Sequence, residues 1–599
     1  MRGIIFLKTT NRIGCDITMR RTKIICTLGP ASETEDVLRQ MVLAGMDIAR
    51  FNFSHGTYEE HQRKLDIIGK LRQELHVPLP TLLDTKGPEI RLGCFENKAI
   101  TLQEGDHFTL TTQDVMGTQD KASISFAGLP ADVHAGDAIL IDDGLIELRV
   151  DTVEDCEIHC TVVNGGPVSD RKGINVPNVN LSIPYISQRD KEDILFGIRA
   201  GFDFIAASFV RTAQDVLDIR EILDQANCSD VRIIAKIENA QGVANIDEII
   251  RVSDGIMIAR GDMGVEIPFE HVPVIQKMII KKVYNSAKYV ITATQMLDSM
   301  MKNPRPTRAE ATDVANAIYD GTSTIMLSGE TAAGKYPVEA VATMAKIAQC
   351  AEEDIDYHGR FDRRRHEAVR DVTNAISHAT CTTAHDLEAT AILTVSQSGH
   401  TARMISKYRP AVPIIGCTVN ERVYRQLAMS WGIYPVLCQE QQDADSLFAH
   451  AVQRAKEELY VEDSDLVVIT AGVPLGIPGT TNLIKVQTVG DVILTGHGIG
   501  GKQVRANVCV AHSEAEARTS FTPGDILVID NTSNEMLDLL KKAAGIITSQ
   551  NNVNSHAAIV GLTLGIPVIV GAANCTTVLR SGTMIILDAE KGIVCNVVG

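Results

Sequence analysis

Short apolar runs rich in β-branched residues alternate, along much of the chain, with amphipathic stretches of helix length such as residues 32–44 and 211–225. Their β-branched content and flanking glycines favour strands over buried helix segments. The eight runs are residues 23–28, 48–53, 81–84, 204–209, 233–237, 255–258, 289–292 and 324–327. Alternation of strands and helices predicts a parallel sheet, and eight such units predict a closed (β/α)8 barrel.

The alternation breaks between the third and fourth runs. From about residue 88 to 184, apolar and polar positions alternate with a period of two, which is typical of half-buried strands. Turn sequences occur around Gly105, Gly136 and Gly144. We predict an inserted all-β domain over 88–184 that rises from one barrel loop and can act as a lid.

A second α/β pattern follows the barrel. Strand-like runs at 391–395, 412–416 and 466–470 predict an α/β regulatory domain over residues 357–490. Residues 491–599 contain further strands and helices and predict one more compact α/β domain.

The predicted fold class is α/β: a (β/α)8 barrel with an inserted all-β lid domain, an α/β C-terminal regulatory domain and an additional C-terminal α/β domain. The barrel comprises residues 19–87 and 185–356. Residues 1–18 hold only a short apolar stretch before Met19, and we expect them to be an extension outside the fold.

Composition narrows the function classes. The 599 residues carry a net charge of −18, which argues against broad nucleic-acid binding, because that requires a basic surface. Thirteen dispersed cysteines without paired spacing indicate reduced thiols, and no apolar run is long enough to span a membrane. We therefore expect a cytoplasmic protein that binds neither nucleic acid nor membrane.

Polar residues stand at the carboxyl ends of the predicted barrel strands, where the catalytic groups of such barrels lie. Glu238 and Asp262 follow neighbouring strands and could jointly hold one Mg²⁺, which takes oxygen ligands and leaves room for substrate oxygens. Lys236 lies two residues before Glu238, so both share one face of their strand. A cation beside a metal-bound oxyanion suits phosphoryl or enolate chemistry. A single carboxylate at a strand end often only caps a helix, so the prediction rests on Lys236, Glu238 and Asp262 occurring together.

Six segments resemble pyruvate kinases, in the same order along the chain. They are RTKIICTLGP at 21–30, NFSHG at 52–56, LDTKGPEIR at 83–91, IAKIEN at 234–239, ARGD at 259–262 and NPRPTRAE at 303–310. The resemblance extends over about residues 20 to 490. It implies transfer of phosphate from phosphoenolpyruvate to ADP, giving pyruvate and ATP in the last step of glycolysis, in a cytoplasmic homotetramer that a phosphorylated metabolite activates.

The resemblance also implies roles for individual residues. Glu238 and Asp262 would hold Mg²⁺ (or Mn²⁺), Lys236 would stabilise the transferring phosphoryl group, and Arg50 would clamp it. Gly261 and Asp262 would contact the substrate, and Thr294 would lie near the enolate carbon that is protonated. The residues that would bind K⁺ are Asn52, Ser54, Asp84 and Thr85, with Glu89 associated with the K⁺ requirement. Those that would face the nucleotide are His55, Arg91 and Lys172. Thr294 could instead only cap a helix, and Lys172 could be a solvated charge in a polar turn.

The loop after run 391–395 has the composition of an anion cradle, with small hydroxyl residues and glycine before a predicted helix. Its residues are Ser396, Gln397, Ser398, Gly399, His400 and Thr401. In the pyruvate kinase family this loop resembles the effector phosphate site; the alternative is an ordinary capped loop. A second loop, 472–481, lacks an Arg or Trp to hold a second phosphate. The effector is therefore expected to be a pentose phosphate or AMP in preference to a bisphosphate.

The C-terminal segment resembles the mobile phosphohistidine domain of phosphoenolpyruvate-utilising enzymes, through NSHAAIV at 554–560 and LGIPVIVG at 564–571. That family has a Gly-Gly pair and a Thr before the Ser-His, whereas asparagines occupy residues 551, 552 and 554 here. The loss of glycine reduces backbone freedom near His556 and favours a packing domain over a phosphocarrier, which remains the alternative. The GxGxxG spelling at 496–501 precedes a strand-like run, so a dinucleotide site is not predicted.

Two other functions compete with phosphoryl transfer. A metal-dependent barrel lyase or aldolase would share the Lys236, Glu238 and Asp262 arrangement but would need no lid over a nucleotide. A metabolite sensor would keep the effector loop and would have lost catalytic residues, yet none of the expected residues is replaced.

Overall fold

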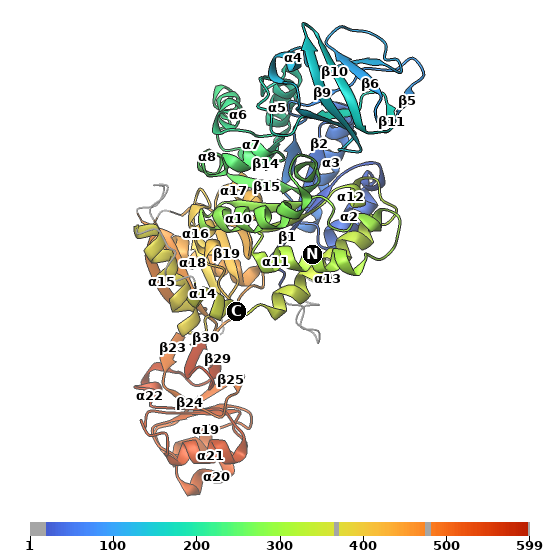
Figure 1. The fold of residues 1–599 in the computed structure, drawn as a ribbon. Coiled ribbons are helices and arrows are strands. Elements are labelled where there is room, and N and C mark those ends of the chain that lie inside the picture. Colours follow the sequence, from blue (N-terminus) through green and yellow to red (C-terminus); the bar gives the residue numbers. More distant parts are fainter. Residues whose placement is uncertain (1–18, 364–370, 442, 474–480, 491, 597–599) are drawn as a thin grey trace. The chain divides into compact units, whose positions relative to one another are not determined.

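The computed structural model describes residues 19–363, 371–441, 443–473, 481–490 and 492–596 (Figure 1). Residues 1–18, expected to be an extension, and most of the 472–481 loop lie outside these ranges. The chain forms two compact units. The first contains the residues up to Asn374 together with Ser396–Leu437, and the second contains Ala375–Val395 and Cys438–Gly599.

A closed parallel barrel forms the centre of the first unit. The strand order around it is β1-β17-β16-β15-β14-β13-β3-β2. All eight predicted runs are barrel strands, with ends that agree within two residues. The strands are β1 (Lys23–Thr27), β2 (Ile48–Asn52), β3 (Thr81–Asp84), β13 (Phe204–Ala207), β14 (Arg232–Ile237), β15 (Gly255–Ala259), β16 (Tyr289–Ala293) and β17 (Thr324–Leu327).

Helices follow the barrel strands, and side-chain caps determine several of their first residues. The helix expected at 32–44 begins only at Glu35, because the Thr34 hydroxyl accepts the backbone N–H of Val37. The helix expected at 211–225 begins at Ala213, after a capping box between Thr212 and Asp215. The helices of the barrel region are α2 (Glu35–Ala44), α3 (Tyr58–Leu75), α5 (Gln188–Ala200), α6 (Ala213–Gln225), α7 (Ala240–Ala244), α8 (Ile246–Val252), α9 (Arg260–Glu266), α10 (Val272–Asn285), α11 (Arg308–Asp320), α12 (Gly329–Ala332) and α13 (Pro337–Asp354).

The inserted domain is a β structure with one short helix, α4 (Leu129–Asp132). Its larger sheet has the order β4-β12-β8-β9-β10-β6-β7, and β11 pairs with β5. Positive φ angles at Gly105, Gly136 and Gly144 confirm the three predicted turns. The strands are β4 (Ile90–Arg91), β5 (Ala99–Leu102), β6 (His107–Thr111), β7 (Lys121–Ser123), β8 (Ala138–Ile141), β9 (Ile146–Glu154), β10 (Glu157–Asn164), β11 (Gly166–Ser169) and β12 (Gly173–Asn175).

The segment Ser396–Leu437 belongs to the first unit and closes one end of the barrel. Met429 is fully buried in the apolar cluster that fills the barrel interior, with Ile25, Phe204 and Met326 among its members. The Thr324 hydroxyl donates to the carbonyl of Met429 over 3.0 Å. The elements of the segment are α16 (His400–Lys407), β19 (Ile414–Thr418), α17 (Glu421–Leu427) and β20 (Ile433–Leu437). β19 begins two residues later than expected, because Pro413 has no N–H to donate to a ladder.

Asp203 joins this segment to the barrel. Its side chain is completely buried and accepts from the N–H of Thr81 and from the guanidinium groups of Arg72 and Arg425. Gln426 donates to the Asp203 carbonyl and, over 2.8 Å, to the carbonyl of Asp230. One carboxylate therefore links β3, α3 and α17.

Replacing Asp203 with asparagine should lower the apparent Tm by at least about 5 °C, because breaking one partner of a buried ion pair costs about 3–5 kcal/mol. Differential scanning calorimetry measures the shift. The matched control is Asp230→Asn, whose carboxylate is more than half exposed in its pair with Arg422 and should change stability by less than about 1 kcal/mol. Equal midpoints for the two variants would refute the role given to Asp203.

The second unit contains two sheets. In the first, β18 (Ala391–Val395) runs parallel to β21 (Leu466–Gly472), which pairs antiparallel with β22 (Thr481–Thr488). The second sheet has eight strands in the order β23-β30-β29-β25-β26-β27-β28-β24. Its strands are β23 (Val492–Thr495), β24 (His497–Ile499), β25 (Gln503–Val510), β26 (Ile526–Ile529), β27 (Gly545–Thr548), β28 (Val568–Val570), β29 (Met584–Asp588) and β30 (Ile593–Asn596).

The remaining helices are α14 (Tyr357–Arg363), α15 (Val372–Asp386), α18 (Ala444–Glu457), α19 (Glu514–Ser520), α20 (Leu537–Leu540), α21 (His556–Leu564) and α22 (Cys575–Val578). The GxGxxG segment forms β24 and leads into strand β25, as expected from the sequence. Each cysteine in the described ranges is a free thiol. Among the described helices, none combines the length and apolarity needed to cross a bilayer.

Candidate active site

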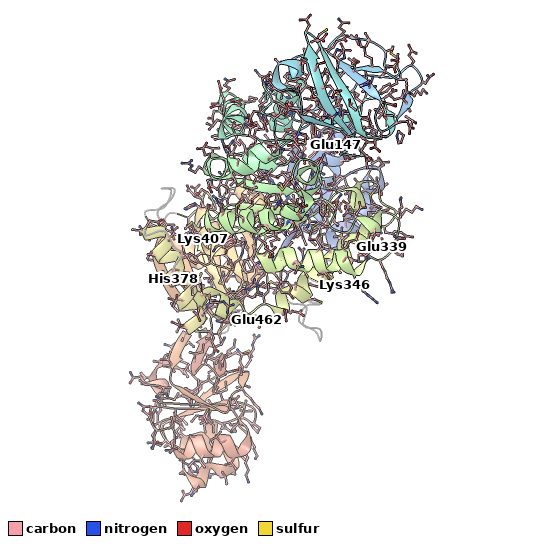
Figure 2. The ribbon with its side chains drawn as sticks, viewed as in Figure 1. Glu147, Glu339, Lys346, His378, Lys407 and Glu462 are labelled. Carbon is pink, nitrogen blue, oxygen red and sulfur yellow. The ribbon has the colours of Figure 1, made fainter. Side chains whose placement is uncertain are left out.

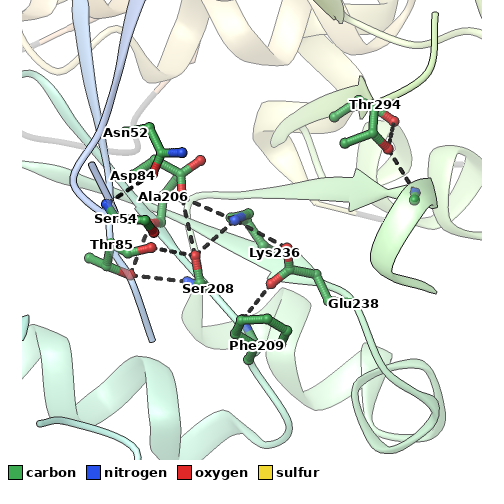
Figure 3. A network of polar contacts seen from close by, with 12 residues as sticks. Asn52, Ser54, Asp84, Thr85, Ala206, Ser208, Phe209, Lys236, Glu238 and Thr294 are labelled. Atoms are coloured by element: carbon green, nitrogen blue, oxygen red, sulfur yellow. Dashed lines mark hydrogen bonds and ion pairs between the residues drawn. The ribbon is translucent and has the colours of Figure 1, made fainter. Parts of the chain in front are cut away.

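The carboxyl ends of β2, β3, β13 and β14 bring the predicted catalytic residues together (Figure 3). Lys236 lies on β14, with Glu238 just beyond its end, and Asp84 is the last residue of β3. The Lys236 ammonium donates to Asp84 Oδ1 over 3.0 Å and lies 3.1 Å from Glu238 Oε1. The carboxylates of Asp84 and Glu238 therefore flank the buried Lys236 ammonium.

The charged groups of this cluster shift one another's pKa values. Burial disfavours the ammonium of Lys236, but the Asp84 and Glu238 carboxylates outweigh it and raise the pKa of Lys236 above its usual range. Burial would raise the pKa of Asp84, yet Arg50 and Lys236 hold that pKa below its usual range. Lys236 and Asp84 are both charged at neutral pH.

Arg50, on β2, is held from two sides. Its Nε donates to Asp84 Oδ2 over 2.6 Å and its Nη1 donates to the Thr27 hydroxyl over 2.7 Å. Within the described ranges Nη2 has no hydrogen-bond partner. The guanidinium is thus fixed in orientation while one donor group remains for an anionic ligand.

Glu238 and Asp262 form the candidate Mg²⁺ pair. Burial, opposed by Lys236 and reinforced by the Asp262 carboxylate, raises the pKa of Glu238 to about 7. The described residues contain no group of three or more His, Cys, Asp or Glu side chains that could enclose a metal. Two repelling carboxylates without a protein cage fit Mg²⁺, which binds through one or two carboxylates and completes its shell with water and substrate oxygens.

Three residues are expected to bind K⁺ with Asp84 (Figure 3): Asn52 is the last residue of β2, and Ser54 and Thr85 follow β2 and β3. Asn52 Oδ1 accepts the backbone N–H of Ser54 over 3.0 Å, and the Thr85 hydroxyl donates to the carbonyl of Ala206. Their oxygens are hard ligands of the kind an alkali cation takes. The structure brings all four residues to the same side of Lys236.

Thr294 lies just past β16 with φ +65°, a left-handed conformation that is strained for a β-branched residue. Its hydroxyl donates to the Ala293 carbonyl over 2.7 Å and accepts the N–H of Gly261 over 2.8 Å. By accepting the N–H of Gly261, the second residue of α9, this hydroxyl satisfies an N–H of that helix's first turn, which is a capping contact. Thr294 contacts the start of α9, which carries Asp262, and both line an open cleft on that side of the barrel.

Ser208 is a site residue that was missed in the sequence. Its hydroxyl donates to the Thr85 carbonyl over 2.6 Å and lies 3.1 Å from Asp84 Oδ1, and it accepts from the Lys236 ammonium over 2.8 Å. The next residue, Phe209, has φ +54° and donates its N–H to Glu238 Oε2. The sequence feature that could have identified Ser208 is a lone serine inside the run 204–209, at the carboxyl end of a barrel strand.

Other strand-end residues have structural roles. Arg260 forms a two-pronged pair with Asp313 at 2.7 Å, and it also donates to the Thr294 carbonyl. Glu330 is buried and accepts the N–H groups of Leu297 and Ser328. These two residues stabilise the loops around the site.

Of the three expected nucleotide residues, Arg91 and Lys172 lie together in the lid. The N–H of Leu92 donates to the Lys172 carbonyl, and the Arg91 guanidinium donates to the carbonyl of Arg171. Lys172 is also paired with Asp142 at 2.7 Å, so it is not a free solvated charge. His55 is an exposed residue of the turn after β2 and makes no side-chain contact with these two among the described residues.

A cleft of about 290 Å³ lies at the base of the lid, with walls from both the lid and the barrel. Asp143 of the lid and Asp262 of α9 both line it. Burial and the charge of Asp262 raise the pKa of Asp143, so the two carboxylates face the same space. Asp143 was read in the sequence only as part of a turn.

The effector-loop residues lie before and in the first turn of α16. Gly399 has φ +71°, and a Cβ there would lie 2.9 Å from a methyl group of Leu427. The Ser398 hydroxyl accepts the N–H of His400. Burial, with the positive charges of Arg403 and Arg232, lowers the pKa of His400. Close packing therefore requires glycine in a loop whose surroundings are cationic.

His556 is the first residue of α21 in the second unit. Its Nδ1 lies 2.8 Å from the Thr532 hydroxyl and its Nε2 lies 3.0 Å from Asn534 Oδ1. None of the asparagines at 551, 552 and 554 has a positive φ. The imidazole is thus engaged at both nitrogens, in a loop that does not use glycine-like conformations.

Comparisons with known proteins agree with this geometry. Three family models match: the pyruvate kinase barrel domain over residues 19–341, the pyruvate kinase alpha/beta domain over 374–487, and the mobile domain of PEP-utilising enzymes over 521–592. The chain is 49% identical to a pyruvate kinase of Sporosarcina psychrophila, covering 96% of this chain and 99% of that protein. It is 51% identical to one of Geobacillus stearothermophilus, covering 96% and 98%.

A solved structure extends the likeness to three dimensions. The crystal structure of a pyruvate kinase from Cryptosporidium parvum matches with a TM-score of 0.76 and 39% identity, covering 80% of this chain and 99% of that one. The full-length relatives, the two pyruvate kinase domain models and the shared fold all indicate the same family. The chain belongs to the pyruvate kinase family of phosphotransferases.

Proposed function

We propose that the cluster around Lys236 transfers the phosphoryl group of phosphoenolpyruvate to ADP. The observation that carries this proposal is the buried Lys236 ammonium between Asp84 and Glu238, beside an Arg50 guanidinium with one uncommitted donor group. Phosphoryl transfer depends on fixed positive charge around the moving group more than on covalent chemistry. Lys236 and Arg50, both buried, would supply that charge.

Glu238 and Asp262 would hold Mg²⁺ or Mn²⁺, and the oxygens of Asn52, Ser54, Asp84 and Thr85 would hold K⁺. The divalent ion would supply Lewis-acid stabilisation of negative charge on the substrate oxygens. The raised pKa of Glu238, which burial causes and the Asp262 carboxylate reinforces, supports this assignment, because a bound cation would stabilise both charged groups.

The protein's own groups would orient the two substrates. Gly261, Asp262 and Thr294 border the cleft on the side where the enolate carbon would take up its proton. Arg91 and Lys172 of the lid would face the nucleotide phosphates, with His55 on the barrel side. The cleft at the base of the lid supports a nucleotide between lid and barrel, and a lyase or aldolase would have no use for it.

Residues Ser396, Gln397, Ser398, Gly399, His400 and Thr401 would bind the phosphate of an activating metabolite. The start of α16 offers backbone N–H groups and hydroxyls, and nearby Arg403 and Arg232 add positive charge. A pentose phosphate or AMP is favoured over a bisphosphate.

Activation by ribose 5-phosphate or AMP should exceed activation by fructose 1,6-bisphosphate when phosphoenolpyruvate is subsaturating. Ser398→Asp should abolish activation and leave the basal rate intact, because the added carboxylate repels the effector phosphate. Gln453→Glu, which adds the same charge on the exposed face of α18, is the matched control. The assay is initial rate against effector concentration. Full activation of the Ser398→Asp enzyme would refute the site.

We propose that the C-terminal domain has a structural, packing role and is not a phosphocarrier. The family also implies a homotetramer. The hydrogen bonds at both nitrogens of His556 support the packing role. Incubation with ³²P-labelled phosphoenolpyruvate should leave no acid-labile label on the protein. Label lost on His556→Ala would reverse this assignment.

A further inference from the structure

Ser208 lies just past β13, and its hydroxyl contacts the Lys236 ammonium (Figure 3). An ammonium group has three N–H donors. The oxygens around this one are Asp84 Oδ1 at 3.0 Å, the Ser208 hydroxyl at 2.8 Å and Glu238 Oε1 at 3.1 Å. The two carboxylates attract the positive charge whichever way the ammonium is turned. The hydroxyl is neutral, so its contribution is the direction in which one N–H points.

The Ser208 hydroxyl accepts from Lys236, because an ammonium group has no lone pair to receive a hydrogen bond. Its own hydrogen is committed to Thr85. The Thr85 carbonyl lies 2.6 Å from the hydroxyl oxygen, closer than Asp84 Oδ1 at 3.1 Å. One hydroxyl therefore joins the loop after β3 to the lysine on β14.

The position of Ser208 is itself fixed by its surroundings. Its backbone N–H donates to the Thr85 hydroxyl over 3.1 Å, and its carbonyl accepts from the hydroxyl of the buried Tyr185 over 3.0 Å. A Cβ at Gly87 would lie 2.9 Å from Ser208 Cβ, so the loop after β3 packs directly against this residue. A serine held in this way is a fixed point against which Lys236 can be oriented.

Ser208 is covered more completely than the cations of the site. It is 1% exposed, whereas Lys236 and Arg50 are each 8% exposed. A ligand that approaches from solvent can therefore touch the two cations, while the serine hydroxyl stays covered. By this criterion Ser208 acts through Lys236 and is a positioning residue.

We propose that Ser208 positions the Lys236 ammonium for phosphoryl transfer. This inference rests on the proposed function, in which Lys236 stabilises the transferring phosphoryl group. Charge stabilises a transition state best when it is already oriented before the reaction begins. Ser208 provides this orientation through one neutral hydrogen bond, and its bond to the Thr85 carbonyl keeps the accepting oxygen in place.

Ser208→Ala should lower kcat by about thirtyfold, the size of effect expected for a hydrogen bond to a charged group. The KM for phosphoenolpyruvate should stay within about threefold of the parent value, because both cations of the site remain. Ser208→Cys keeps the size of the side chain but offers only a weak acceptor, so it should lose activity similarly.

Ser253→Ala is the matched control for these variants. Ser253 is also a buried serine of the barrel region, and its hydroxyl has no hydrogen-bond partner among the described residues. Its substitution should leave kcat within about twofold of the parent. Circular dichroism establishes that each variant is folded before its kinetics are compared.

A double-mutant cycle shows whether Ser208 acts through Lys236. In the Lys236→Ala background, Ser208→Ala should change the residual kcat by less than about twofold, because no ammonium remains to be oriented. Combined with Lys346→Ala, at an exposed lysine of α13 (Figure 2), Ser208→Ala should keep its full effect. A purely structural role would lower the rate by the same factor in both backgrounds.

Two results would overturn the positioning role of Ser208. One is a kcat within twofold of the parent for the folded Ser208→Ala and Ser208→Cys enzymes. The other is an equal loss from Ser208→Ala with and without Lys236. Failure of the proposed function is a separate outcome, measured with Ser208 intact: a Lys236→Ala enzyme with a rate near that of the parent.

Discussion

Replacing Lys236 with alanine should lower kcat by at least about a thousandfold. The ammonium lies between the carboxylates of Asp84, on β3, and Glu238, just beyond β14, at 3.0 Å and 3.1 Å. Without it, negative charge that develops on the transferring phosphoryl group loses its nearest fixed counter-charge. The effect should appear in kcat more than in KM, because Arg50, by the proposed assignment, would still bind the ground-state phosphate.

The fold should survive this substitution. Asp84 keeps its bond to Arg50, and Glu238, with a pKa of about 7, can take up a proton once its cation is removed. Lys346→Ala is the control, since this lysine is exposed on α13. Steady-state kinetics and circular dichroism are measured for both variants. A rate within tenfold of the parent for a folded Lys236→Ala enzyme would contradict the catalytic role of Lys236.

Glu238→Gln should raise the Mg²⁺ concentration for half-maximal activity and lower kcat by at least about a hundredfold. Glutamine keeps the size of the side chain and can still accept the Phe209 N–H, so the loop is preserved. What is lost is the charge that would hold the metal with Asp262. Rates are measured against Mg²⁺, and then against Mn²⁺, at saturating phosphoenolpyruvate and ADP.

Glu266→Gln is the matched control for this experiment. Glu266 is a half-buried carboxylate that lines the cleft at the base of the lid together with Asp262, and burial also raises its pKa, but it bonds to Asn175 and is not at a strand end. Its substitution should leave the Mg²⁺ dependence within about threefold of the parent. If Glu238→Gln shows the same Mg²⁺ dependence as Glu266→Gln, the metal assignment is wrong.

The barrel could be predicted because each strand is a short apolar run whose side chains are buried, apart from Asn52 and Arg232 at the ends of β2 and β14. The charged residues at the strand ends could also be predicted from the sequence, since Lys236 interrupts an apolar run and Glu238 follows it. The starts of helices were harder to predict, because a single hydrogen bond of Thr34 decides one and a capping box of Thr212 and Asp215 decides another. β19 begins later than predicted because Pro413 has no backbone N–H to donate.

Residues that act through neutral hydrogen bonds could not be identified from the sequence. Ser208 looks like part of an apolar run, and only the closed barrel shows that its hydroxyl joins Thr85 and Lys236. Asp143 looks like a turn residue until the lid is placed against the barrel.

A coupled assay decides whether the protein transfers a phosphoryl group from phosphoenolpyruvate to ADP. The full-length protein is mixed with Mg²⁺, K⁺, phosphoenolpyruvate and ADP, with pyruvate followed by NADH oxidation through lactate dehydrogenase and ATP measured in parallel. Pyruvate and ATP should form in equal amounts, and omission of ADP should stop the formation of both. Pyruvate formed at the same rate without ADP, or no pyruvate from the folded protein with all components present, would contradict this transfer.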